Sequence, residues 1–164
     1  RNNFIKKLAL NQTGNTLILF AYVEKHGQVL YDMINSSVDD NRKIFFVHGG
    51  VATEDREEVR RITETQNDAI IIASYGTFST GINIKRLHNI IFASPSKSRI
   101  RNLQSIGRGL RMGDNKSQAT LYDIADDLTH RDKKNYTLGH FQERINIYNE
   151  EGFAYEIHNV NLKA

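Results

Sequence analysis

The chain has 164 residues and no cysteine, and its 22 lysine and arginine residues against 19 aspartate and glutamate residues leave a formal net charge of +3. This length suits one globular domain around a single hydrophobic core. The lack of cysteine excludes a disulfide scaffold, a thiolate zinc site and a cysteine nucleophile, and no apolar run approaches the roughly 20 residues that span a bilayer. We therefore expect a cytoplasmic protein without a membrane partner.

Short apolar runs, rich in β-branched and aromatic residues, alternate with amphipathic stretches. The runs that predict strands are 16–21, 43–47, 69–73, 89–93 and 119–124, with 153–157 as a candidate sixth. The stretches that predict helices are a lead-in over 1–12, then 29–34, 53–62 with Thr53 as its N-cap, 98–106 and 137–148. Alternation of strands and helices predicts a mainly parallel sheet, and runs that are apolar on both faces suit strands covered on both sides. We expect one α/β domain over 1–164, with helices on both faces of the sheet.

Three loops that follow predicted strands are rich in glycines, other small residues or hydroxyls: 48–50, 74–83 and 94–98. Ligands of open α/β sheets bind at the carboxyl ends of the strands. Loops of this composition let backbone N–H groups approach an anion closely. The alternative is that glycine and serine only make turns here.

The stretch from Lys85 to Lys116 is strongly basic. It holds eight lysines and arginines against one acid, Asp114, so its local charge is +7 in a chain that is +3 overall. This concentration indicates a surface facing a polyanion or a phosphate site. The alternative is a solvated basic face, but such a face usually interleaves acids with bases.

The residues over 104–111, Gln-Ser-Ile-Gly-Arg-Gly-Leu-Arg, resemble Q-x-x-G-R-x-x-R, the last conserved motif of superfamily-two helicases and translocases. Three earlier elements of that family occur in the expected order: the strand and loop over 17–25, residues 47–50 with Arg56 downstream, and residues 73–83. The last two motifs are closest to phage recombination and repair DNA helicases. The resemblance implies a RecA-like three-layer sandwich with about six strands, similar to P-loop NTPases but lacking the P-loop.

Neither a G-x-x-x-x-G-K-[ST] loop nor an acidic D-E-x-[DH] box occurs in the sequence. In the resembled family, a preceding lobe carries the phosphate loop and the Mg²⁺ ligands. The chain begins at Arg1 rather than at a methionine, so we expect it to be part of a longer protein. The resemblance implies a second motor lobe that is inactive alone and completes an ATP site with the first lobe.

By resemblance, Arg108 and Arg111 are arginine fingers that act in catalysis. They are three residues apart, so on a helical turn both can point at one phosphate of ATP. The resemblance also implies nucleotide contacts from Gln104, Gly81 and Asn83, although the family often carries aspartate where Asn83 stands. The implied nucleic-acid contacts are Tyr22, His48, Gly49, Arg56, Ser74 and Thr77. Hydroxyls and backbone N–H groups at such places hold phosphates without reading bases.

The expected function is therefore that of the C-terminal motor lobe of an ATP-dependent DNA helicase. We expect it to remodel branched DNA and RNA–DNA hybrids in recombination, replication and repair, within the host cytoplasm if the protein is of phage origin. Its partners are then DNA and the N-terminal lobe of the same chain. One alternative is a non-catalytic nucleic-acid-binding module with a vestigial arginine motif. A free-standing phosphate-binding enzyme is a further alternative, but it needs a phosphate loop that this sequence lacks. The six histidines are scattered, so no metal site is predicted.

Overall fold

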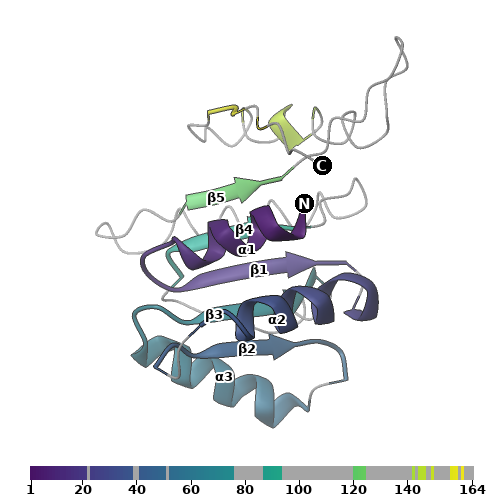
Figure 1. Ribbon diagram of the computed structural model, residues 1–164. Helices are drawn as coiled ribbons and strands as arrows, with labels where there is room; N and C mark the ends of the chain where they lie inside the picture. Colours follow the sequence, from purple (N-terminus) through teal and green to yellow (C-terminus); the bar gives the residue numbers. More distant parts are fainter. Residues whose placement is uncertain are drawn as a thin grey trace.

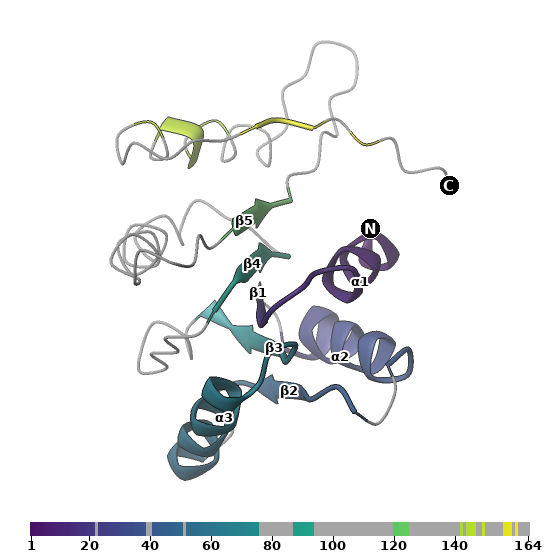
Figure 2. The same ribbon diagram turned by 90° about the vertical axis from the view of Figure 1, so that its left-hand side faces the viewer.

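The computed structural model describes residues 1–21, 23–38, 41–50, 52–75, 87–93 and 120–124, together with 142, 144–146, 149, 156–158 and 160. In this part of the chain, five parallel strands form one sheet that lies between two layers of helices (Figure 1). Figure 2 shows α1 and α2 on one face of the sheet and α3 on the other. The three-layer arrangement expected from the sequence is confirmed.

Helices and strands alternate from α1 to β3, and the described elements after β3 are the strands β4 and β5. The helices are α1 (Asn2–Leu10), α2 (Gln28–Asn35) and α3 (Thr53–Thr65), with a π-helical turn, η1 (Val23–Gly27), directly before α2. The strands are β1 (Thr16–Phe20), β2 (Ile44–Val47), β3 (Ile70–Ser74), β4 (Asn89–Phe92) and β5 (Thr120–Asp123). Their order in the sheet is β2-β3-β1-β4-β5, and all neighbours are parallel. The lead-in helix and the first five predicted strands are confirmed, each strand to within one residue at either end.

The predicted N-cap of α3 is wrong by one residue. Ala52 is the N-cap, with extended backbone (φ −61°, ψ 151°), and Thr53 is the first helical residue. The reason is that the backbone N–H of Arg56 donates to the carbonyl oxygen of Ala52 (3.0 Å), which starts the helical ladder one residue earlier than the pattern suggests. Glu54 and Asp55 lie in the first turn, as predicted, where their charge favours the helix dipole.

Some predicted elements fall outside the described residues. The helix over 98–106 lies entirely outside them, as do 153–155 of the candidate sixth strand, whose described residues 156 and 157 do not form a strand. Within the predicted helix over 137–148, the described residues 142 and 144–146 are helical.

Burial of each strand follows its place in the sheet. The central strands β1 and β4 are buried throughout, whereas β2 and β5, at the two edges, are largely half-buried. Edge strands have a neighbour on one side only, so part of their surface meets solvent. The prediction of strands covered on both faces therefore holds for the centre of the sheet.

Two apolar cores lie on opposite faces of the sheet because successive strand residues point to opposite sides. Leu17 and Leu19 of β1 belong to the first core, against which Val59 of α3 packs. Ile18 and Phe20 belong to the second, which α1 and α2 cover. The helix residues buried in this second core are Ile5, Ala9, Leu30 and Ile34.

Asn15 ties the amino end of the sheet to α3. Its fully buried side chain donates from Nδ2 to the carbonyl oxygens of Thr63 (3.1 Å) and Gln66 (2.9 Å). Its Oδ1 accepts from the backbone N–H of Ala69 (2.9 Å), and its backbone N–H donates to Nδ1 of His88 (3.0 Å). These bonds fix the end of α3 against the start of β1 and β3. They lie at the amino end of the sheet, opposite the carboxyl edge where ligands of such sheets bind.

Candidate nucleic-acid interface

The carboxyl ends of the parallel strands meet at one edge of the sheet. There Ser74 of β3 pairs in register with Phe20 of β1, and Val47 of β2 pairs with Ala73 of β3. His48 directly follows Val47, and Ser74 directly follows Ala73. His48 and Ser74 therefore lie next to each other, one residue beyond the Val47–Ala73 pair. The structure thus places these two predicted nucleic-acid contacts at the same edge, as a parallel sheet requires.

His48 is held by its own loop and by an aromatic cluster. Its Nδ1 accepts a hydrogen bond from the backbone N–H of Gly50 (3.1 Å). Its ring stands edge-on to Phe46, with centroids 5.1 Å apart and an interplanar angle of 86°. Phe46 in turn meets the rings of Phe20 (5.6 Å) and Tyr31 (5.4 Å). Since Nδ1 accepts, a neutral ring carries its hydrogen on Nε2, which is a suitable donor to a phosphate oxygen.

Gly49 is not required by the backbone of this loop. It is exposed, its φ is not positive, and an added Cβ would find no atom within 4 Å. At Gly50, by contrast, an added Cβ would lie 3.0 Å from Cε1 of His48. The bare backbone at Gly49 therefore offers room for a partner to approach, and the fold itself does not use that room.

Ser74 is the last residue of β3. Ser74 is half-buried, while the next residue, Tyr75, is 2% exposed and packs in the core. The ring of Tyr75 lies against that of Phe92, with centroids 5.9 Å apart. Tyr75 thus anchors the chain just beyond Ser74 and keeps Ser74 at the carboxyl edge.

Arg56 lies in the first turn of α3, directly after the loop that leaves β2. Its residue is half-buried, unlike its exposed neighbours Asp55 and Glu57. The loop is short, so the start of α3 is tied to the carboxyl end of β2. Arg56 therefore belongs to the same end of the sheet as His48.

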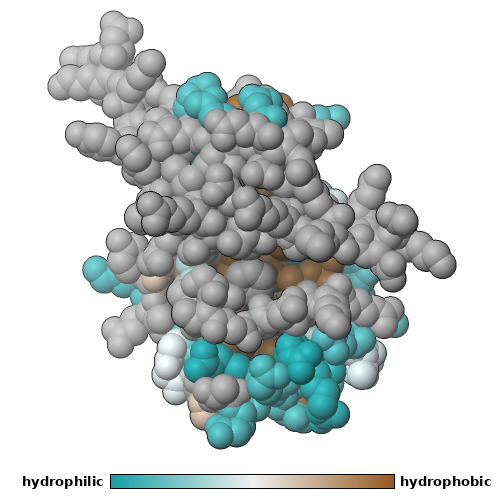
Figure 3. Space-filling view, turned by 180° about the vertical axis from the view of Figure 1, so that it is seen from behind, coloured by the Kyte–Doolittle hydropathy of each residue, from teal (hydrophilic) through white to brown (hydrophobic). Residues whose placement is uncertain are grey.

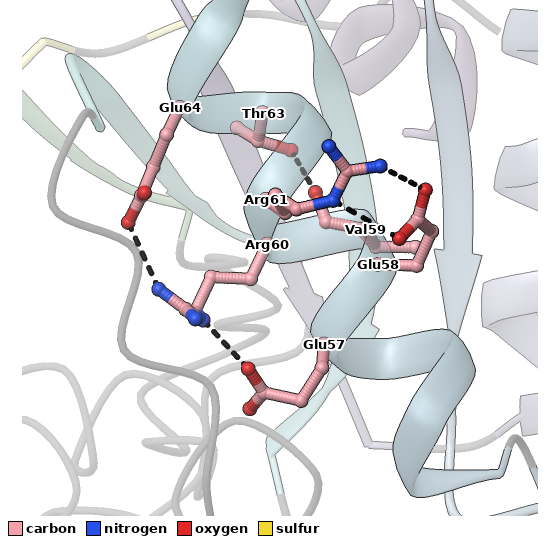
Figure 4. A network of polar contacts seen from close by, with 7 residues as sticks. All are labelled: Glu57, Glu58, Val59, Arg60, Arg61, Thr63 and Glu64. Atoms are coloured by element: carbon pink, nitrogen blue, oxygen red, sulfur yellow. Dashed lines mark hydrogen bonds and ion pairs between the residues drawn. The ribbon is translucent and has the colours of Figure 1, made fainter.

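The other arginines of α3 form an ion-pair ladder on the helix surface (Figure 4). Arg60 contacts Glu57 (2.9 Å) and Glu64 (3.2 Å), and Arg61 donates through Nε to Glu58 (3.1 Å). Hydrogen bonding to Glu57 raises the pKa of Arg60, and hydrogen bonding from Arg61 lowers the pKa of Glu58. Figure 3 shows hydrophilic side chains gathered at this end of the molecule. Their charges offset one another, so this surface is a poor candidate for binding a polyanion.

Seven predicted site residues lie outside the described residues. They are Tyr22, Thr77, Gly81, Asn83, Gln104, Arg108 and Arg111. The eight lysines and arginines of the basic stretch from Lys85 to Lys116 also lie outside them. Their assignments remain predictions from the motifs.

The described residues contain no group of three or more histidine, aspartate or glutamate side chains arranged to hold a metal ion. Among the same residues, none of the helices combines the length and apolar character needed to cross a membrane. The described part of the carboxyl edge therefore offers hydrogen-bond donors, and no metal centre.

Three contacts near the carboxyl edge were not predicted. Nε2 of His26 lies 3.0 Å from Oδ1 of Asn2 and joins η1 to α1. The guanidinium of Arg1 donates to the carbonyl oxygens of residues 93 and 124, and the guanidinium of Arg144 pairs with the carboxylate of Asp123. Each contact joins residues more than 20 positions apart, and no local pattern marks them.

Comparison with known proteins identifies the family. The helicase conserved C-terminal domain matches residues 1–113. The ATP-dependent DNA helicase uvsW of Enterobacteria phage T4 is 38% identical over 175 residues, which cover 99% of this chain and 34% of that protein. A putative ATP-dependent RNA helicase, QP509L of African swine fever virus, is 25% identical and covers 84% of this chain and 25% of its own length. The chain thus spans between a quarter and about a third of these relatives.

The crystal structure of T4 UvsW has the same fold, with a TM-score of 0.73 at 38% identity over 93% of this chain and 33% of that one. Domain 2 of the DEAD-box helicase Mss116p, solved with an RNA duplex, matches 77% of this chain and 48% of its own with a TM-score of 0.57. At 16% identity, this second likeness shows the fold alone. The predicted RecA-like fold and the resemblance to superfamily-two helicases of phage are both confirmed. The chain belongs to the helicase conserved C-terminal domain family.

Proposed function

We propose that this chain is the second motor lobe of an ATP-dependent DNA helicase or translocase. The observation that carries the proposal is the similarity to T4 UvsW, which is 38% identical over 99% of the chain and is named as an ATP-dependent DNA helicase. In this proposal residues 1–164 form one lobe that is inactive alone. A first RecA-like lobe supplies the phosphate loop and the Mg²⁺ ligands, for which this sequence has no motif.

DNA binds at the carboxyl edge of the sheet in this proposal. His48, Ser74 and the backbone of Gly49 hold the phosphates of one strand, and Arg56 adds positive charge from the start of α3. Tyr22 and Thr77 join them by their place in the motifs. Contacts of this type fix the position of the strand without reading its bases, so binding should depend little on sequence and fall steeply with salt.

ATP is the substrate, and it binds between the two lobes. Arg108 and Arg111 neutralise charge on the transferred phosphoryl group, a role worth about 10³- to 10⁵-fold in rate. Gln104, Gly81 and Asn83 contact the nucleotide, and Gln104 links it to closure of the lobes. Alternating closure and release, while the carboxyl edge grips one strand, moves the protein along DNA.

We also propose the class of nucleic acid and its biological setting. Similarity to a phage DNA helicase supports action on DNA. The residues of the last two motifs are closest to those of phage recombination and repair helicases, which supports branched DNA and RNA–DNA hybrids as substrates in recombination, replication and repair. The host cytoplasm is the corresponding location.

The decisive experiment measures DNA-stimulated ATP hydrolysis by the intact protein carrying Arg108→Ala. We expect kcat to fall by about 10³-fold or more, because an arginine finger contributes on that scale. Arg60→Ala is the matched control, since Arg60 lies in the ion-pair ladder of α3 and should leave kcat unchanged. Full activity of the Arg108 variant would refute the finger assignment.

A second candidate function is a non-catalytic nucleic-acid-binding module, which the charge of +7 over residues 85–116 favours. The two proposals differ in the effect of the first lobe. A binding module should hold DNA equally well alone and within the intact protein. A motor lobe should bind DNA with an affinity that changes when a non-hydrolysable ATP analogue closes the two lobes. Fluorescence anisotropy of labelled DNA measures both.

A further inference from the structure

Arg144 and Asp123 form a buried ion pair at the carboxyl end of β5. Nε of Arg144 donates to Oδ2 of Asp123 at 2.6 Å, and a terminal guanidinium nitrogen donates to Oδ1 at 2.8 Å. The side chains of Arg144 and Asp123 are only 1% and 8% exposed. Two parallel hydrogen bonds between planar groups fix orientation as well as distance. Arg144, a helical residue 21 positions further along the chain, is thereby linked to Asp123, the last residue of β5.

A second guanidinium reaches the same end of the sheet from the opposite end of the chain. Arg1 donates to the carbonyl oxygen of Ala93, just beyond β4, and to that of Ile124, just beyond β5 (3.2 Å). These two positions lie on neighbouring strands, since Phe92 pairs with Asp123. Figure 1 shows α1 starting at this end of the sheet. The carboxyl ends of β4 and β5 are therefore bridged by Arg1, and β5 is held again by Arg144.

The strand β5 needs such ties more than the other strands do. It lies at an edge of the sheet, has four residues, and pairs only with β4 among the described strands. Its residues are exposed or half-buried, whereas every residue of β4 is buried. Leu121 and Tyr122 of β5 pack, partly buried, against the two cores, and polar contacts add to this packing in holding the short edge strand.

The position of β5 matters because of the segment that precedes it. Residues 94–119 connect β4 to β5, and they carry Gln104, Arg108 and Arg111. One end of this segment is set by β4, a fully buried strand, and the other by β5. A displacement of β5 would therefore be passed to the segment that holds both proposed arginine fingers.

We propose that Arg144 is a positioning residue for ATP hydrolysis, which acts by fixing β5, and so the end of the 94–119 segment, through its ion pair with Asp123. The inference rests on the proposed function of Arg108 and Arg111. The family model matches residues 1–113, so this inference also assigns a role to a residue outside the matched part of the chain. A buried ion pair adds little net stability over apolar residues of similar volume, whereas its directional bonds set geometry. An error of about 1 Å at a catalytic group can lower a rate by about 10²-fold.

The test uses the intact protein with two variants, Arg144→Met and the double variant Asp123→Leu/Arg144→Met. The single variant removes the Arg144 guanidinium from the buried Asp123 carboxylate, so we expect a lower melting temperature. The double variant removes that charge, so stability should return. The two variants share the loss of the bidentate pair, and they differ in stability.

The readouts are kcat and KM for ATP at saturating DNA, together with DNA affinity and melting temperature. We expect both variants to lose roughly 10- to 100-fold in kcat, with KM and DNA affinity within about twofold of the parent. The double variant keeps the low kcat although its melting temperature recovers. Arg60→Met on the surface of α3 is the control for loss of an ion-paired arginine, and it should match the parent.

The inference is overturned if kcat of the double variant returns to the parent value together with stability, because Arg144 would then be only structural. If Arg144→Met does not fold, the double variant alone carries the same test. Arg108→Ala, assayed beside them, separates this inference from the function on which it rests. Loss of activity in the Arg108 variant with full activity in the double variant refutes the positioning role alone. Full activity of the Arg108 variant refutes both.

Discussion

Replacing Asn15 by alanine removes three hydrogen bonds that hold α3 to the amino end of the sheet. Nδ2 donates to two carbonyl oxygens, of Thr63 and Gln66, and Oδ1 accepts from the N–H of Ala69. Each buried polar group left without a partner costs about 1–3 kcal/mol. The oxygen of Gln66 is only partly buried, so water replaces some of that loss. We expect the free energy of unfolding to fall by about 3–5 kcal/mol, a large share of a typical total of about 5–15 kcal/mol.

Urea unfolding followed by circular dichroism measures this loss. Asn11→Ala is the matched control, because Asn11 is exposed and should change stability by less than about 0.5 kcal/mol. Asn15→Asp gives a sharper test, since a carboxylate has no N–H for the two carbonyl oxygens and should destabilise at least as much as alanine. A loss below about 1 kcal/mol in the alanine variant, or a tolerated aspartate, would contradict the assigned hydrogen bonds.

Three further predictions follow from single contacts. Gly49→Ala should leave the melting temperature unchanged, because its Cβ meets no atom, but should weaken binding of labelled single-stranded DNA; unchanged affinity would argue against approach of a phosphate there. Gly27→Ala should lower the free energy of unfolding by about 1–3 kcal/mol in urea titrations, since the new Cβ would lie 2.4 Å from the ring of Phe20; a neutral effect would contradict this packing. Arg61→Ala should return the lowered pKa of Glu58 toward its ordinary value, as NMR titration of that carboxyl would report. The lowered pKa means that this ion pair stabilises the folded protein above the unfolded-state pKa of Glu58. This stabilisation is lost as pH falls through the lower pKa of the folded state.

The strands could be predicted because burial on both faces leaves a local mark. Leu17 to Phe20 are all fully buried, so each position of that run is apolar. The N-cap of α3 could not be placed from the sequence, because threonine is a preferred N-cap residue and alanine is not, yet Ala52 takes that position without a side-chain cap hydrogen bond.

The candidate interface was predicted through strand ends. His48 and Ser74 each follow an apolar run, and parallel pairing brings those ends to one edge. The aromatic support under His48 was not predicted, because Phe20, Tyr31 and Phe46 come from three separate elements. The roles of these residues in binding stay predictions until the variants are measured.

By itself, the sequence determined the alternation of strands and helices, the apolar faces that become the two cores, and the motif order that marks the helicase family. These properties depend on residues close together in the chain, where periodicity and composition act directly. Only the tertiary structure decided the order β2-β3-β1-β4-β5 and the links from Asn15 to α3 and from Arg144 to β5. Such contacts join residues distant in sequence, and their energy depends on burial and on partners that exist only once the sheet has formed.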